Sequence, residues 1–146
     1  MNKKVMFLAG FVFLLLFFAC EDNSIVSVDN DNIIDIEIEK ENSPRIIKEK
    51  GSFSFGLDGD DFSGITNEVV DFSSEHIVLA INLEDYKSGT CKLTINSEYN
   101  NELFSKTITS NIIYSEVVEF DDFPEQIILE FSDFTGTMKM AFAEED

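Results

Sequence analysis

Apolar and polar residues alternate along most of the chain beyond residue 32. Between residues 34 and 38 isoleucines alternate with acids, and between 53 and 57 large apolar residues alternate with small ones. A period of two is typical of a β-strand with one buried face. The segment 76–83, HIVLAINL, is nearly continuous in apolar residues and predicts a central strand. Further rows predict about eight strands in all, the others lying at 91–95, 103–109, 112–120, 127–131 and 138–142.

Segments rich in turn-forming residues separate these rows. They are Asp58-Gly59-Asp60-Asp61, Tyr86-Lys87-Ser88-Gly89 and Asp121-Asp122-Phe123-Pro124, and Ser110-Asn111 predicts a tight hairpin turn. Only Ile65 to Ser74 is ambiguous, with room for one helical turn. Short strands at regular spacing without a long amphipathic window predict an all-β fold. We expect an antiparallel β-sandwich, immunoglobulin-like or jelly-roll-like, with a small β-barrel as the alternative.

The first nineteen residues have a different character. Lys3 and Lys4 precede an apolar run from Val5 to Ala19, which is the pattern of a signal peptide. Fifteen helical residues span about 22 Å, less than the roughly 30 Å of a bilayer core. A cleaved signal is therefore favoured over a transmembrane anchor.

The end of this run, Leu16-Phe17-Phe18-Ala19-Cys20, resembles the lipobox of bacterial lipoproteins, although Phe17 stands where the family usually has an aliphatic residue. The resemblance implies cleavage before Cys20 and several lipid chains on that cysteine, which hold a protein stably on a membrane. Glu21-Asp22-Asn23-Ser24 resembles the acidic export signal of Bacteroidota-type lipoproteins. That implies the outer face of the outer membrane, the alternative being an acidic tether without a sorting role. We expect a signal peptide at 1–19, a tether at 20–32 and one β-sandwich domain at 33–146.

The chain beyond the predicted cleavage site is strongly acidic. It holds all 29 acidic residues but only eight basic ones, a formal charge of −21. This charge argues against nucleic acid as a partner, because phosphate binding needs clustered Lys and Arg. The charge is typical of a solvated surface or of one that attracts a cationic protein or a divalent ion.

Few residues are suited to catalysis. The lone histidine, His76, precedes an apolar strand, and the sequence has no nucleophile elbow, zinc-ligand spacing or phosphate loop. Cys91 shares a strand face with Leu93 and Ile95 and is expected to be a buried, inert thiol. If Cys20 carried no lipid, a Cys20–Cys91 disulfide would be the alternative. The sequence thus predicts no enzyme.

Two sets of residues are candidate binding sites. Asp58, Asp60 and Asp61 could supply oxygen ligands to calcium, although they lack EF-hand spacing and are equally typical of an acidic turn. Tyr86, Tyr99 and Tyr114 lie near turns or on polar faces and could contact a sugar or a protein. The leading hypothesis is a membrane-tethered, non-catalytic β-sandwich that binds or scaffolds at the cell envelope. The alternatives are an acidic inhibitor or immunity-type lipoprotein against a cationic enzyme, and a carbohydrate-binding module.

Overall fold

The computed structural model describes residues 34–145, and this part of the chain folds into six antiparallel strands. No helix occurs in it, so none is present there that could cross a membrane. The all-β prediction is confirmed. The strands are β1 (Arg45–Glu49), β2 (Ser52–Val69), β3 (His76–Asn96), β4 (Glu102–Ile108), β5 (Ile112–Glu119) and β6 (Gln126–Glu144).

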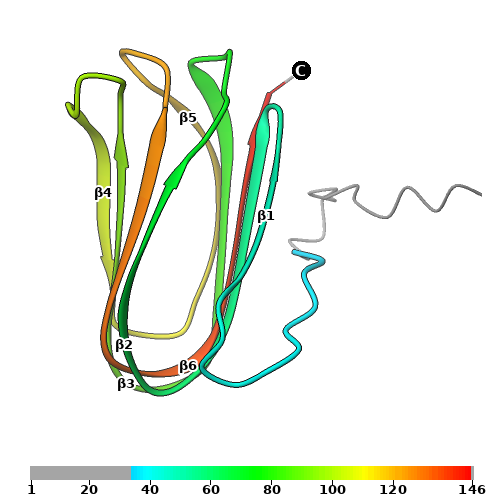
Figure 1. The fold of residues 1–146 in the computed structure, drawn as a ribbon, viewed down its shortest axis with the longest axis vertical. Helices are drawn as coiled ribbons and strands as arrows, with labels where there is room; N and C mark the ends of the chain where they lie inside the picture. Colours follow the sequence, from blue (N-terminus) through cyan, green and yellow to red (C-terminus); the bar gives the residue numbers. More distant parts are fainter. Residues whose placement is uncertain (1–33, 146) are drawn as a thin grey trace, which may run out of the picture.

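Three long strands belong to both layers of the sandwich. β2, β3 and β6 contain 18, 21 and 19 residues, and Figure 1 shows all three bending into a U at the same end of the molecule. On one side of the bend the strand order is β1-β2-β6-β3-β5, and on the other it is β2-β6-β3-β4. Each of the three strands therefore contributes one half to the five-stranded layer and the other half to the four-stranded layer. Their bends connect the two layers at one end of the molecule.

Special backbone conformations make the bend, which we call the corner (residues 58–61, 84–89 and 133–137). Each long strand has one aspartate there with a positive φ: Asp61 at 55°, Asp85 at 50° and Asp133 at 49°. Aspartate tolerates this left-handed region better than most residues because its short side chain bonds locally. The pairing register shifts at these points, as expected where strands pass from one layer to another through bulges.

The core lies between the two layers and consists of the inward rows of the strands. Phe53, Phe55 and Leu57 of β2 are fully buried, as are Leu93 of β3 and Leu129 of β6. These rows are the ones that the alternation predicted. Near the corner the ring of Phe131 lies 5.7 Å from that of Phe55, 5.5 Å from Phe62 and 5.2 Å from Phe134.

The segment 34–38, expected to be a strand, crosses the outer face of the five-stranded layer without pairing into it. Ile34 and Ile36 are buried there against Ala80 and Ala141. A Cβ added to Gly56 would lie 3.2 Å from Ile36 Cγ2. The segment can therefore pack closely on the sheet only because the residues beneath it are small. Its period of two reflects docking on a sheet face rather than membership of the sheet. We call residues 34–38 the strap.

Several other expected boundaries are wrong. The segments Asp58–Asp61 and Tyr86–Gly89 are not turns but bends within β2 and β3, and the row pairs on β3 and β6 merge, so six strands replace eight. Residues 65–69 belong to β2 and contain no helical turn, while β1 was not expected. Ser110-Asn111 does not close a hairpin, because β4 and β5 pair with different halves of β3 and lie in different layers.

A lysine bridges the two layers at each open side of the sandwich. Lys48 Nζ of β1 lies 2.6 Å from Glu68 Oε2 on the far half of β2. Lys106 Nζ of β4 lies 4.7 Å from the ring centroid of Tyr114 on β5. These contacts join edge strands of opposite layers.

Candidate functional site

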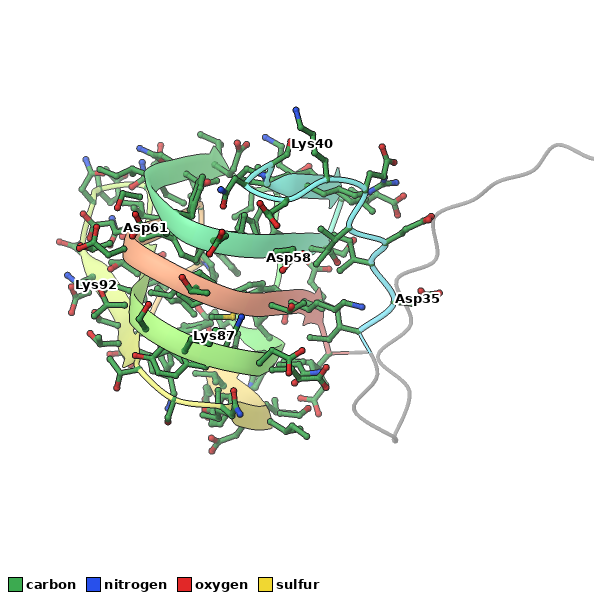
Figure 2. The ribbon with its side chains drawn as sticks, turned by 90° about the horizontal axis from the view of Figure 1, so that it is seen from below. Asp35, Lys40, Asp58, Asp61, Lys87 and Lys92 are labelled. Carbon is green, nitrogen blue, oxygen red and sulfur yellow. The ribbon has the colours of Figure 1, made fainter. Side chains whose placement is uncertain are left out.

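An open cleft of about 760 Å³ lies at the corner. Figure 2 shows this end from below, with β2, β6 and β3 side by side, Asp58 on β2 and Lys87 on β3. The loop before β1, the three bent strands and the β4–β5 connection all contribute. The lining residues are Glu41, Asp58, Gly59, Asp60, Asp85, Tyr86, Lys87, Asn111, Thr135, Gly136 and Thr137.

Asn42 fixes one wall of the cleft. Its backbone N–H donates to the Asp58 carbonyl at 2.7 Å, and its side-chain Nδ2 donates to the Asp60 carbonyl at 2.9 Å. The Asp60 N–H in turn donates to Asn42 Oδ1 at 2.8 Å. These three bonds use only the backbone of β2, so they leave the Asp60 carboxylate free and hold the neighbouring Glu41 at the cleft.

Asn111 and Tyr86 fix the opposite wall. The Tyr86 N–H donates to Asn111 Oδ1 at 2.9 Å, which ties the β4–β5 connection to the bend of β3. The Tyr86 hydroxyl donates to the Gly89 carbonyl at 2.8 Å, and its ring packs against the core. Tyr86 therefore lines the cleft as a structural residue with its hydroxyl already bonded.

Negative charge dominates the cleft. Four carboxylates, those of Glu41, Asp58, Asp60 and Asp85, line it with one cation, Lys87. None of the four takes part in an ion pair within residues 34–145. Among the four, only the Asp58 carboxylate accepts a side-chain hydrogen bond from the described part of the chain, from the Thr137 hydroxyl to Oδ1 at 3.3 Å. Because these four acidic side chains lie together without a cationic partner of their own, the cleft favours a positively charged group.

The calcium prediction gains no support from this arrangement. Asp58 and Asp60 line the cleft, whereas Asp61 does not, and its N–H donates to Thr135 Oγ1 at 3.0 Å. Within residues 34–145 no group of three or more His, Cys, Asp or Glu side chains is arranged to hold a metal ion. Calcium binding at Asp58, Asp60 and Asp61 stays a prediction.

A second hollow of about 440 Å³ adjoins the cleft and shares Asp85 and Asn111 with it. Its other lining residues include Leu83, Ile112 and Ile113, of which Ile113 is 66% exposed. Together the two hollows place apolar surface beside the acidic group. This suits a ligand that carries both positive charge and apolar surface, as the long side chains of Lys and Arg do.

The other two predicted tyrosines lie away from the cleft. Tyr99 is 75% exposed in the β3–β4 connection, at the end opposite the corner. Tyr114 on β5 donates its hydroxyl to Glu116 Oε2 at 2.7 Å and lies under Lys106. Partial burial and the Glu116 carboxylate raise the pKa of Tyr114 to about 12. The structure thus does not gather the three tyrosines into one surface.

Neither Cys91 nor His76 lines the cleft. Cys91 is a free, fully buried thiol, and burial raises its pKa to about 12. His76 begins β3 at the surface, with Nε2 3.7 Å from Glu119 Oε1. Cys20 and the predicted signal peptide and tether lie outside the described residues.

Comparisons with known proteins leave the family open. No protein-family model matches the chain, and no curated protein matches it. One similar solved structure is a family 6 carbohydrate-binding module, at 10% identity and a TM-score of 0.28, covering 70% of this chain and 82% of that one. Another is CsCBM6-3 from Clostridium stercorarium in complex with cellobiose, at 12% identity and a TM-score of 0.28, covering 75% and 92%. At these TM-scores the likenesses carry no argument about the ligand.

Sequence reasoning named Asp58, Asp60 and Tyr86 but not as one site. It missed Glu41, Asp85, Lys87 and Asn111, which come to the cleft from other segments. The feature that could have linked them is that Asp58–Asp61 and Tyr86–Gly89 are both rich in residues that favour turns. The two segments come together because each is a bend in a strand that pairs with β6.

Proposed function

We propose that this protein is a non-catalytic binding lipoprotein of the cell envelope whose corner cleft takes a cationic ligand. The observation that carries the proposal is the set of four carboxylates facing one cleft with a single lysine. A protruding Lys or Arg side chain of a partner protein has the right chemistry, and arginine can engage a carboxylate through two parallel bonds. This corresponds to an inhibitor or immunity-type role against a basic enzyme.

The charge of the whole chain supports the same ligand. A formal charge of −21 beyond Cys20 attracts cations from a distance, so association is expected to be fast and sensitive to salt. Exposed ion pairs contribute only about 0.2–1 kcal/mol each. Four carboxylates acting on a basic segment would therefore give moderate affinity, with further contacts from the adjoining apolar hollow.

The proposed anchor would keep the cleft near the membrane. Lipid on Cys20 would be separated from the strap by 13 residues, which reach about 45 Å at most when fully extended. The strap and the next few residues lead directly to Glu41 at the cleft. The tether would therefore join the domain only a few residues before the cleft.

Capture of basic proteins from an envelope extract tests the binding proposal. The variant D58N/D60N/D85N removes three cleft charges at nearly constant shape, and Asn tolerates the positive φ of Asp85. The matched control E98Q/E102Q/D121N removes three exposed charges at the end opposite the corner. We expect the parent and the control to retain basic proteins at low salt and release them at high salt, and the cleft variant to retain few. Equal capture by all three proteins would refute the cleft as the binding site.

A neutral glycan is the second candidate for the same cleft. Tyr86, Asn111 and the hydroxyls of Thr135 and Thr137 line it beside the carboxylates, and such groups also bond sugar hydroxyls. Glycan binding would persist at high salt, because it involves no charge on the ligand. A glycan array with the parent and the Asn111→Ala variant separates the two candidates. Salt-resistant glycan binding lost in N111A favours the sugar, and absence of any bound glycan eliminates it.

The anchor and its location form a separate part of the proposal. Cys20→Ser is expected to abolish incorporation of radiolabelled palmitate and to release the protein from membranes. Protease treatment of intact cells then distinguishes the two sides of the outer membrane. Digestion of residues 33–146 on intact cells supports surface exposure, and digestion only after permeabilisation supports a periplasmic domain.

A further inference from the structure

The two layers of the sandwich differ in what covers their outer faces. The strap lies across the five-stranded layer, whereas within residues 34–145 no second segment of buried hydrophobic residues lies on the four-stranded one. On that open face Ile65 and Val69 of β2 are 71% and 70% exposed. Covering these two side chains would remove apolar area from water.

This open face is electrically neutral at its centre. A cross-strand row runs through Ile65, Glu130, Lys92 and Thr107, one residue from each strand. Lys92 Nζ lies 4.0 Å from Glu130 Oε2, so one base and one acid stand side by side. Both are about half exposed and thus remain accessible to another molecule.

The next row on the same face contains no charge at all: it consists of Asn67, Ile128, Thr94 and Ser105. Asn67 and Ser105 are exposed, whereas Thr94 at its centre is only 7% exposed. The neighbours of these residues along each strand, such as Leu93 and Leu129, point into the core. In a chain of net charge −19, the middle of the four-stranded layer is therefore a surface that another acidic molecule can approach without repulsion.

We propose that a second copy of this chain packs on this face. In the layer order β2-β6-β3-β4 the centre lies between β6 and β3. A two-fold axis along the strands at that centre places all four strands of one copy over those of the other. It puts Lys92 of each copy opposite Glu130 of the other, and Ile128 opposite Thr94, so the contact is self-complementary. Aligned sheets pack in this way in β-sandwiches.

The pair of opposite charges at the centre of the face favours a second copy over an unrelated protein. A symmetric contact uses the Lys92–Glu130 pair twice, with each base opposite an acid. A purely cationic or anionic partner would leave one member of that pair opposed by like charge.

The size of the face sets the expected strength. Four strands about 4.8 Å apart and seven residues at about 3.3 Å each give a face of roughly 19 by 23 Å. Two such faces bury roughly 900 Å², which is below the standard size of stable interfaces and within the range of transient ones. The dimer is thus weak in solution, and confinement on a membrane would raise its population.

Charge exchange across the proposed axis gives a specific test. Lys92→Glu would place two glutamates opposite each other in both contacts, and Glu130→Lys would do the same with lysines. Mixing the two variants restores an acid opposite a base in both contacts. The control variants K50E and E98K make the same charge changes in the β1–β2 turn and the β3–β4 loop, away from the face. The protein in its processed form, in excess mild detergent, is followed by sedimentation equilibrium.

The parent and both controls are expected to dimerise reversibly at high protein concentration. Each single variant should associate about tenfold more weakly, equivalent to about 1.4 kcal/mol, and the equimolar mixture should recover the parent's affinity. A monomeric parent up to millimolar concentration overturns the proposal. Single variants that dimerise like the parent also overturn it, as does a mixture no tighter than either variant. None of these variants alters the corner cleft, so failure here leaves the proposed function untouched.

Discussion

Gly89 is the position where the corner is most sensitive to a single methyl group. Its φ is +82°, and a Cβ added there would lie 2.2 Å from the Asp133 carbonyl oxygen and 2.5 Å from that of Ser132. Both obstacles are backbone atoms of β6 and cannot rotate away. Gly89→Ala therefore needs β3 and β6 to separate at the point where both pass between layers.

The cost has two parts. A left-handed conformation costs a residue with a side chain roughly 1–2 kcal/mol. Displacing the β6 backbone also weakens the neighbouring bonds, including the one from the Tyr86 hydroxyl to the Gly89 carbonyl, worth about 1 kcal/mol. We expect a loss of at least about 2–3 kcal/mol in the free energy of unfolding, a large part of the 5–15 kcal/mol typical of a domain.

Urea unfolding followed by far-UV circular dichroism measures this loss, because the chain lacks tryptophan. The control is Gly64→Ala, on the same kind of strand but without a positive φ, where the added Cβ meets only the end of the Phe62 ring at 3.1 Å. We expect that control to change stability by less than about 1 kcal/mol. A loss in Gly89→Ala no larger than in Gly64→Ala would refute the close approach of β3 and β6 at the corner.

Three further predictions concern single side chains. Cys91, whose pKa burial raises to about 12, should not react with a thiol reagent at pH 8 until urea unfolds the protein; rapid labelling of the native state would contradict its burial. Tyr114 should ionise near pH 12 by ultraviolet absorbance, so the stability that it contributes is complete below its unfolded pKa of about 10 and is lost as the pH rises toward 12. In Glu116→Gln its pKa should fall, and an unchanged titration would show that the carboxylate has no part. Ile36→Ala should destabilise the domain by about 2–4 kcal/mol, and the partly exposed Ile38→Ala by less, as measured by urea unfolding; an unaffected Ile36→Ala would mean that the strap does not dock.

Alternation predicted the core well because a buried face imposes the same requirement on any strand. The rows at 53–57, 91–95, 127–131 and 138–142 all point inward as expected. The same rule failed at 34–38, because one-sided docking on a sheet produces the same period without strand pairing. Alternation reports which side is buried and cannot report which backbone bonds are made.

The corner was misread for a related reason. Asp and Gly tolerate positive φ, and the chain uses that property both in turns and in bulges within strands. Asp58–Asp61 and Tyr86–Gly89 therefore looked like chain reversals, although β2 and β3 continue through them. Whether such a segment reverses or bends depends on partners more than forty residues away on β6.

For the same reason the cleft could be predicted only in fragments. Asp58 and Tyr86 were candidates from residue type alone, whereas Glu41 and Asn111 had no local signal. They reach the cleft because Asn42 bonds to the β2 backbone and because β4 and β5 lie in different layers. Long-range pairing of this kind is not encoded in the local pattern of either segment.

The most direct test of the proposed cleft is hydrogen–deuterium exchange of the protein with and without a decalysine peptide as the cationic probe. We expect slower exchange on binding in three separate segments, 58–60, 84–87 and 135–137, with little change in the loops 97–101 and 120–125 at the other end. We also expect D58N/D60N/D85N to lose this protection. Protection confined to the opposite end, or spread evenly over the acidic surface, would contradict the corner cleft as the binding site.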